Sequence, residues 1–454
     1  EVAQWFPRVA VYDDVQGWNT MPYLGAGEFY LEYGDIEFNI TAPSDLIIVG
    51  SGELLNAKDC YTGEQVKRWE AAAKSNTTVA IRSAEEVGKN NSRPAAAELI
   101  WKFKITNTRD AAWAASKAFI IDAAKIDLPS GKKCMAISAY AEESIGKNGW
   151  QRSTEMIKGS IEHYSNKWFE FPYPAATNVA GIVGGMEYPG IVFCSARSMG
   201  EELWGVTDHE FGHTWFPMIV GSNERKYAWM DEGFNTFIND LSTAAFNKGE
   251  FKSSFFPDPS APFMVRMTFG EKMDGLYNIP DVVQQNNLAI TAYMKPAQML
   301  HALRDQVLGE ERFDRAFREY VRRWAFKHPT PWDFFHTMEN VSGEDLGWFW
   351  RSWVLNAWKL DLAVKEVRYK KGDFANGAEI IIETLEKMPM PVTVKVVETN
   401  GSEHKLNLPV EIWQRGAQWT FGVPTTSEIK QVVLDPDKKL PDWDRNNNTW
   451  KKGN

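Results

Sequence analysis

The spacing of apolar residues changes twice along this chain of 454 residues, and this change constrains the fold more than any other feature. Up to about residue 145 apolar and polar residues alternate, which predicts half-buried strands. From about 146 to 357 apolar residues recur every three or four positions, which predicts helices. After Trp358 the alternation returns. We therefore expect a multidomain α+β protein with a β domain at 1–145, a mainly helical domain at 146–357 and a β-sandwich at 358–454.

Specific residues carry each part of this prediction. Expected strand faces contain Ile36, Phe38 and Ile40, then Leu99, Trp101, Phe103 and Ile105, and later Val392, Val394, Val396, Leu406, Leu408, Val410 and Ile412. Expected helix faces contain Ile157, Ile161, Tyr164 and Trp168, and Phe313, Phe317, Tyr320 and Trp324. The last stretch, 444–454, is mostly polar, and we expect it to fray.

Charge and cysteine content exclude several classes of function. The net charge is −10 without a basic stripe, which argues against nucleic acid as a partner. No run of about eighteen apolar residues occurs, so we expect no transmembrane segment. The three cysteines, Cys60, Cys134 and Cys194, are widely spaced, which is typical of ordinary thiols rather than of a disulfide framework.

Residues 209–213 read His209-Glu210-Phe211-Gly212-His213, the pattern HExxH. On a helix, residues four apart share a face, so both imidazoles can bind one Zn²⁺ while the glutamate lies beside it. Gly212 is unfavourable inside a helix, and we expect that another backbone approaches closely there. The spacing predicts one zinc ion per chain, with Glu210 as the general base.

Such a site needs a third protein ligand and an open position for water. Glu232 follows His213 after eighteen residues, enough for a helix end, a loop and a second helix that returns a carboxylate to the metal. We expect His209, His213 and Glu232 to be the ligands.

HExxH followed by this glutamate resembles the gluzincin peptidases, and specifically the aminopeptidase N family, whose catalytic domain is thermolysin-like. Gly184-Gly185-Met186-Glu187-Tyr188 is similar to the family's glycine-x-methionine-glutamate-asparagine motif, with Tyr188 in place of asparagine. The resemblance implies that Glu187 holds the free α-amine of a peptide substrate and that Gly185 and Met186 line its binding site.

Two weaker matches extend the resemblance. Tyr293, in Tyr293-Met294-Lys295, lies where the family's transition-state tyrosine falls, and Gln4, in Gln4-Trp5-Phe6-Pro7, resembles a substrate-binding glutamine of the N-terminal domain. The chain starts at Glu1 in what looks like the middle of that domain, so we expect its second half only. The match to bacterial members with an HEFGHTW metal helix implies a periplasmic, cell-envelope or secreted location.

The residues predict a zinc-dependent aminopeptidase acting on peptides with a free N-terminus, and two alternatives stay open. A thermolysin-like endopeptidase also uses HExxH and a distant glutamate but needs no amine-binding carboxylate. A non-catalytic scaffold could keep the fold without turnover. Side-chain preference and oligomeric state have no signal in the sequence.

Overall fold

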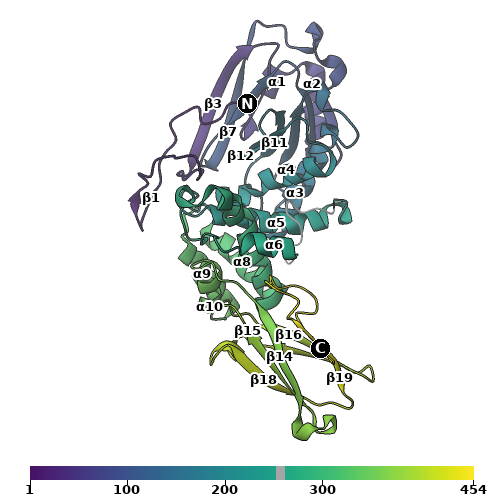
Figure 1. The fold of residues 1–454 in the computed structure, drawn as a ribbon. Coiled ribbons are helices and arrows are strands. Elements are labelled where there is room, and N and C mark those ends of the chain that lie inside the picture. Colours follow the sequence, from purple (N-terminus) through teal and green to yellow (C-terminus); the bar gives the residue numbers. More distant parts are fainter. Residues whose placement is uncertain (252–260, 454) are drawn as a thin grey trace. The chain divides into compact units, whose positions relative to one another are not determined.

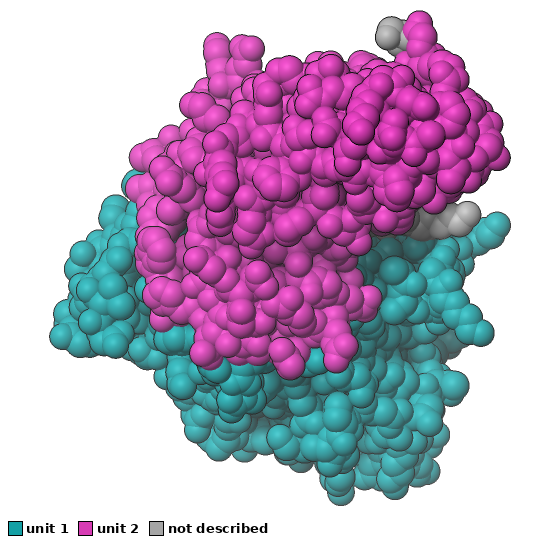
Figure 2. Space-filling view, turned by 90° about the horizontal axis from the view of Figure 1, so that it is seen from below, with its two compact units in different colours: residues 1–255, 317–331 teal, residues 256–316, 332–454 magenta. Residues whose placement is uncertain are grey.

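The computed structural model describes residues 1–251 and 261–453, and its elements are labelled in Figure 1. The chain divides into two compact units, coloured separately in Figure 2. Unit 1 comprises residues 1–255 and 317–331, and unit 2 comprises 256–316 and 332–454. Within the described residues, no helix is both long and apolar enough to cross a membrane. All three cysteines are free and buried.

Unit 1 is built around a six-stranded sheet in the order β12-β13-β11-β10-β9-β6. Strands β10, β11 and β13 are parallel, and the other neighbours pair antiparallel. Strands β10 and β11 pair across the expected boundary near residue 145. The strands are β6 (Val79–Arg82), β9 (Ile120–Lys125), β10 (Met135–Tyr140), β11 (Ala175–Gly181), β12 (Gly185–Tyr188) and β13 (Ile191–Ser195).

Smaller sheets of unit 1 confirm the alternation read from the first part of the chain. Leu99, Trp101, Phe103 and Ile105 are buried on β7, and Phe38 of β3 stacks on Phe103 with ring centroids 5.1 Å apart. These strands are β1 (Tyr12–Asp13) with β2 (Gly17–Trp18), β3 (Gly34–Pro43) with β7 (Glu98–Thr108) and β5 (Glu53–Leu54), and β4 (Ile47–Gly50) with β8 (Trp113–Ser116).

Three helices of unit 1 carry or support the candidate site: α3 (Ser153–Lys167), α4 (Gly200–Gly212) and α5 (Glu232–Ala245). As predicted, α3 buries Ile157, Ile161 and Tyr164, and it packs against β9, β10 and β11 as well as against α4 and α5. Two short helices, α1 (Ala57–Cys60) and α2 (Gly63–Ala72), follow β5. The side chain of Thr62 caps α2 by accepting from the N–H of Gln65.

Unit 2 contains a helical part and two antiparallel sheets. Its helices are α6 (Pro262–Thr268), α7 (Lys295–Ala302), α10 (Gly347–Trp353) and most of α9 (Pro331–Ser342). Helix α8 (Glu310–Trp324) begins in unit 2 and ends in unit 1, and it buries Phe313, Phe317 and Tyr320 as predicted. The sheets have the orders β14-β15-β18 and β17-β16-β19-β20, and β14 packs against β19 and β20.

The strands of these sheets are β14 (Leu362–Tyr369), β15 (Ala378–Thr384), β16 (Val392–Glu398), β17 (Glu403–Leu408), β18 (Gln418–Val423), β19 (Ile429–Leu434) and β20 (Thr449–Lys451). Val392, Val394 and Val396 are buried as predicted.

Two predictions about this part of the chain are wrong. Val410 and Ile412 lie in a 3₁₀ helix, Val410–Trp413, because Pro409 has no N–H with which to continue the ladder of β17. The polar tail does not fray over 444–453: β20 pairs with β19, and Arg445 Nη1 lies 3.0 Å from Asp435 Oδ2.

Candidate metal centre

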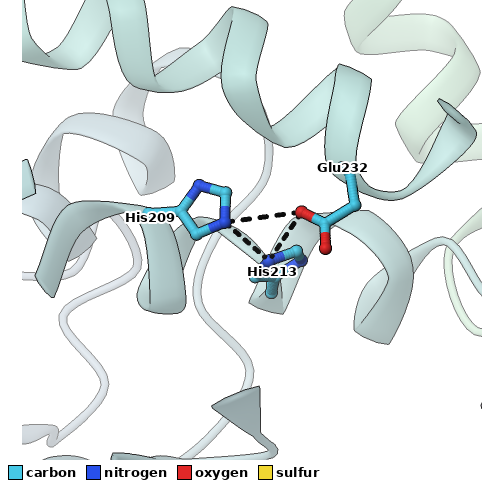
Figure 3. Close-up of side chains that lie close together, drawn as sticks. All are labelled: His209, His213 and Glu232. Atoms are coloured by element: carbon cyan, nitrogen blue, oxygen red, sulfur yellow. Dashed lines mark hydrogen bonds and ion pairs between the residues drawn. The ribbon is translucent and has the colours of Figure 1, made fainter. Parts of the chain in front are cut away.

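Two adjacent helices bring the three expected metal ligands together (Figure 3). His209 and His213 lie one turn apart at the end of α4, with their Nε2 atoms 3.2 Å from each other. Glu232 is the first residue of α5, and its Oε2 lies 3.4 Å from each Nε2. All three side chains are buried, so the ligand atoms face one another away from bulk water.

The triangle formed by these atoms fits a zinc ion. Two ligands held at about 2.0–2.1 Å from a tetrahedral ion are about 3.3–3.4 Å apart. The observed separations of 3.2, 3.4 and 3.4 Å match this spacing. Two imidazole nitrogens and one carboxylate oxygen are also the donor set that zinc prefers in a catalytic site. His209, His213 and Glu232 could therefore hold one zinc ion with a position open for water.

The chain after α4 fixes the orientation of His213. Beyond Gly212 it leaves the regular helix, and Phe216 and Pro217 adopt non-helical backbone angles. His213 Nδ1 consequently lies 3.0 Å from the carbonyl oxygen of Phe216 and 2.8 Å from Asp231 Oδ1. Both neighbours are acceptors, so Nδ1 carries a proton and Nε2 faces the other ligands.

Buried charges shift the pKa values of these residues in opposite directions. Burial disfavours the imidazolium, but Glu187, Asp231 and Glu232 outweigh it and raise the pKa of His213 well above its usual value. Burial alone would raise the pKa of Glu232, but both imidazoles lower it far below the usual range. His213 and Glu232 therefore favour opposite charges. A bound cation would take the place of the proton on Nε2 of His213, while Nδ1 would keep its own.

Glu210, the expected base, is buried beside the ligands and against strand β12. A Cβ added to Gly185 would lie 2.3 Å from Glu210 Oε1, so the glycine makes room for this carboxyl. Burial raises the pKa of Glu210 to about 8, His213 opposes this shift and Glu232 adds to it. A carboxyl with such a pKa can exchange a proton near neutral pH, as a general base must.

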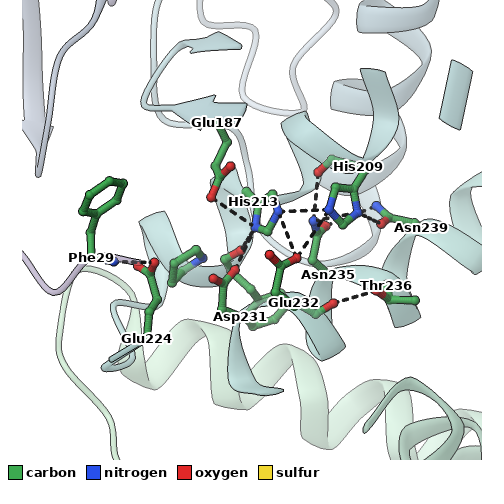
Figure 4. A network of polar contacts seen from close by, with 12 residues as sticks. Phe29, Glu187, His209, His213, Glu224, Asp231, Glu232, Asn235, Thr236 and Asn239 are labelled. Atoms are coloured by element: carbon green, nitrogen blue, oxygen red, sulfur yellow. Dashed lines mark hydrogen bonds and ion pairs between the residues drawn. The ribbon is translucent and has the colours of Figure 1, made fainter. Parts of the chain in front are cut away.

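Glu187 extends from β12 toward the same cluster (Figure 4). Its Oε1 lies 3.8 Å from His213 Nδ1, and the side chain is buried. Burial raises the pKa of Glu187 well above its usual value; His213 opposes the shift, while Glu210, Asp231 and Glu232 reinforce it. A buried carboxyl that resists ionisation when empty is well suited to bind a cation.

Glu28 is a further carboxylate that the sequence analysis missed. Burial raises its pKa well above the usual value, and Glu187, Glu232 and Glu224 raise it further. Its Oε2 is buried without a hydrogen-bond partner, although the carboxyl also interacts with Glu187. No local motif marks Glu28, because it joins the site only through tertiary folding.

The segment around Glu28 is held by the loop that precedes α5. The N–H of Phe29 donates to Glu224 Oε2 at 2.8 Å (Figure 4). Arg109 pairs with the other oxygen of Glu224. A Cβ on Gly27 would lie 2.8 Å from Arg225 Cα, so the two backbones are in close contact. These contacts fix the backbone on both sides of Glu28.

The structure positions the remaining predicted residues as follows. Gln4 Nε2 donates to the hydroxyl of Tyr188 at 3.2 Å, which ties the N-terminal segment to β12. Met186 lies on β12 opposite Phe193. Tyr293 lies in a π-helical segment, Ile290–Met294, of unit 2, and its role stays a prediction.

The reason we expected for Gly212 is wrong in one respect. Its close neighbours are side chains of α5, not another backbone: an added Cβ would lie 2.0 Å from Asn235 Oδ1 and 2.8 Å from Asn239 Nδ2. Asn239 Oδ1 in turn lies 2.9 Å from His209 Nδ1. Glycine is needed because polar side chains occupy the space where a Cβ would lie.

Known proteins resemble this chain in both sequence and fold. Residues 153–353 match the model of the peptidase family M1 domain. The chain is 28% identical over 170 residues to Aminopeptidase M1 of Arabidopsis thaliana, covering 35% of this chain and 18% of that protein. It is 20% identical over 239 residues to Aminopeptidase N of Lactococcus lactis subsp. lactis, covering 48% of this chain and 28% of that protein. The matches thus span less than a third of each relative's length.

A solved structure shares the fold at low sequence identity. The crystal structure of Legionella pneumophila aminopeptidase A in complex with aspartic acid superposes with a TM-score of 0.64 and 12% identity. The superposition covers 90% of this chain and 44% of that one. The chain therefore shares its fold, a β region, a helical region and C-terminal sheets in that order, with part of that solved structure.

Proposed function

Residues 153–353 match the peptidase family M1 domain, and on this premise we propose that the chain is a zinc-dependent aminopeptidase that removes single residues from the free N-terminus of peptides. One observation carries the proposal. The atoms His209 Nε2, His213 Nε2 and Glu232 Oε2 are spaced as a tetrahedral ion requires, and two further buried carboxyls, Glu210 and Glu187, adjoin them. This combination supports both hydrolysis and recognition of a cation.

The chemistry divides between the ion and the side chains. Zinc held by His209, His213 and Glu232 would supply a Lewis acid that lowers the pKa of a water to about 7. Glu210 accepts the proton of the attacking water and gives it to the leaving amine. The hydroxyl of Tyr293 is assigned, from the family resemblance, to donate to the oxyanion of the transition state; loss of such a donor typically lowers kcat by about 10²–10³.

Glu187 and Glu28 account for the choice of a free N-terminus. A substrate ammonium replaces the proton that these buried carboxyls otherwise retain, and it donates charge-assisted hydrogen bonds to them. An internal peptide segment offers no cation there, so the carboxyls would keep their protons and the charge-assisted hydrogen bonds, worth about 1.5–3 kcal/mol each, would be lost. This difference favours an exopeptidase over an endopeptidase.

The proposal is tested by hydrolysis of aminoacyl-anilides and of their N-acetylated counterparts. We expect the protein to cleave only the free amines, to lose activity on chelation and to regain it when zinc is added. Equal cleavage of the acetylated compounds would point to an endopeptidase, and absence of hydrolysis by the zinc-loaded protein would point to a scaffold.

A Glu28→Gln variant tests the amine pocket separately. Removing one charged acceptor should lower kcat/KM by about 10–100-fold, mainly through KM, because such hydrogen bonds are worth about 1.5–3 kcal/mol. Glu53→Gln, which changes an exposed glutamate of the same unit, is the matched control. An unchanged KM in Glu28→Gln would remove Glu28 from the pocket and leave the metal chemistry unaffected.

A further inference from the structure

His209 Nδ1 faces a side-chain amide, whereas His213 Nδ1 faces the backbone carbonyl of Phe216 and a carboxylate. His209 Nδ1 lies 2.9 Å from Asn239 Oδ1, and His213 Nδ1 lies 2.8 Å from Asp231 Oδ1. Figure 4 shows Asn239 on one side of the His209 ring and His213 on the other. Groups that hold a metal-ligating histidine from behind determine its tautomer and its basicity. The difference therefore bears on how each imidazole binds the ion.

The orientation of the Asn239 amide is set by its other contacts. Its Nδ2 donates to the hydroxyl of Tyr164 at 2.8 Å, to Asn235 Oδ1 at 3.1 Å and to the carbonyl oxygen of Asp208 at 3.3 Å. All of these partners can accept, so the nitrogen must face them and Oδ1 must face His209. Nδ1 of His209 therefore carries the proton, and its Nε2 presents a lone pair to the ligand cluster.

The hydrogen bonds that start at His209 run through Asn239 and Tyr164 and end at the buried carboxyl of Asp208. Because the Tyr164 hydroxyl accepts from Asn239, its own proton goes to Asp208 Oδ2, at 2.8 Å. Ser242 also donates to Asp208 Oδ2. On the Nδ1 side, hydrogen bonds connect His209 to the carboxyl of Asp208 through the neutral amide of Asn239 and the hydroxyl of Tyr164, whereas Asp231 lies directly beside Nδ1 of His213.

Gly212 provides the space for this arrangement. Asn235 lies one turn before Asn239 on α5; its Nδ2 donates to the carbonyl oxygen of His209 at 2.8 Å while its Oδ1 accepts from Asn239. A Cβ at position 212 would lie 2.0 Å from Asn235 Oδ1. Since that distance is far below van der Waals contact, and the same Cβ would lie 2.8 Å from Asn239 Nδ2, any larger residue must displace both asparagines.

The geometry points to an amide clamp, formed by Asn235 and Asn239 in the space left by Gly212, that positions His209 as a neutral ligand for the ion. The inference rests on the proposed metal site, but it concerns residues that touch neither the ion nor a substrate. The clamp sets zinc affinity by holding one tautomer and one ring orientation, so its three members act as a unit.

The test measures the zinc dissociation constant by competition with a chromophoric chelator, and the fold of the metal-free protein by circular dichroism. Asn239→Ala and Gly212→Ala should each weaken zinc binding by about 10–100-fold, the usual effect of removing a group that orients a ligand. Gly63→Ala is the matched control, because Gly63 begins helix α2 and a Cβ there meets no atom within 4 Å.

The double variant Gly212→Ala/Asn235→Ala separates the clamp from a general loss of stability. If the alanine at 212 acts by displacing Asn235 and Asn239, it should weaken zinc binding less in the Asn235→Ala background than in the wild type, because part of the two effects has the same cause. Wild-type affinity in Asn239→Ala and Gly212→Ala, or additive losses in the double variant, would overturn the clamp. Failure of the wild-type protein to bind zinc would instead overturn the proposed function.

Discussion

The two sides of the candidate metal centre differ in kind. One side, the carboxylate face, consists of Glu28, Glu187, Glu210 and Asp231; the other, the amide face, consists of Asn235, Asn239 and Tyr164. On the carboxylate face burial raises the pKa of each carboxyl, and Glu28 Oε2 has no hydrogen-bond partner. On the amide face the donors of Asn239 and the hydroxyl of Tyr164 are hydrogen-bonded within the network.

This contrast shows that the residues around the end of α4 serve two purposes: some hold a metal ligand in place, and others exchange a proton or accept a cation. A satisfied network of neutral groups is rigid, because each donor and acceptor already has a partner, and it can hold a ligand in one geometry. Buried carboxyls with perturbed pKa values are instead poised to exchange a proton or accept a cation. We therefore expect changes on the carboxylate face to alter turnover and substrate binding, and changes on the amide face to alter affinity for the ion.

The largest expected effect is that of Glu210→Gln, which breaks the carboxylate face at its reactive group. The amide keeps the shape beside Gly185 but cannot accept the proton, so kcat should fall by about 10²–10⁴-fold. The zinc dissociation constant should change little, because Glu210 is not among the three ligands. Steady-state hydrolysis of an aminoacyl-anilide measures kcat, and competition with a chelator measures the zinc dissociation constant.

Glu201→Gln on the exposed side of the same helix is the control for that variant. Turnover by Glu210→Gln at the wild-type rate would exclude Glu210 as the base and would leave the carboxylate face with a binding role alone.

A smaller effect is expected from Asp231→Asn. In this variant Nδ1 of His213 would face a side-chain amide, as Nδ1 of His209 does. The side-chain oxygen can still accept from Nδ1, so orientation is kept while the charge is lost. Zinc affinity should fall by about tenfold, the lower end of the range for such groups. Chelator competition measures it, with Asp14→Asn as an exposed control. Unchanged zinc affinity would mean that the charge of Asp231 does not contribute to zinc binding by His213.

Local spacing explains why the sequence predicted the core of the site. His209 and His213 are four residues apart on one helix, and Glu232 begins the next helix, so each ligand is marked by a pattern of its own. The apolar faces of α3 and α8 were likewise predicted, because burial of one helix face follows from the 3.6-residue period.

The residues that surround the ligands could not be found in this way. Glu28 reaches the site from a segment far from Glu187 in the sequence, and its neighbours are set by tertiary packing. Gly212 signalled a close approach, but a single glycine does not tell whether a backbone or an asparagine occupies the space. Val410 was assigned to a strand because its apolar neighbours alternate, although Pro409 ends the ladder.

The last expected effect is a pH dependence of stability that belongs to the carboxylate face. Burial raises the pKa of Glu210 to about 8 in the folded, metal-free protein, whereas an unfolded chain has the usual value of about 4.3. The unfolded state therefore loses this proton first as the pH rises, and folding stability should decrease between about pH 4.5 and 8. One such group contributes at most about 1.4 kcal/mol per pH unit.

Urea unfolding of the metal-free protein at several pH values, compared with Glu210→Gln, isolates this contribution. The glutamine variant cannot release a proton, so its stability should fall less steeply over the same interval. Identical slopes in the two proteins would show that Glu210 is ionised in the folded state. The carboxylate face would then differ from the amide face in charge, and Glu210 could accept a proton without first having to lose one.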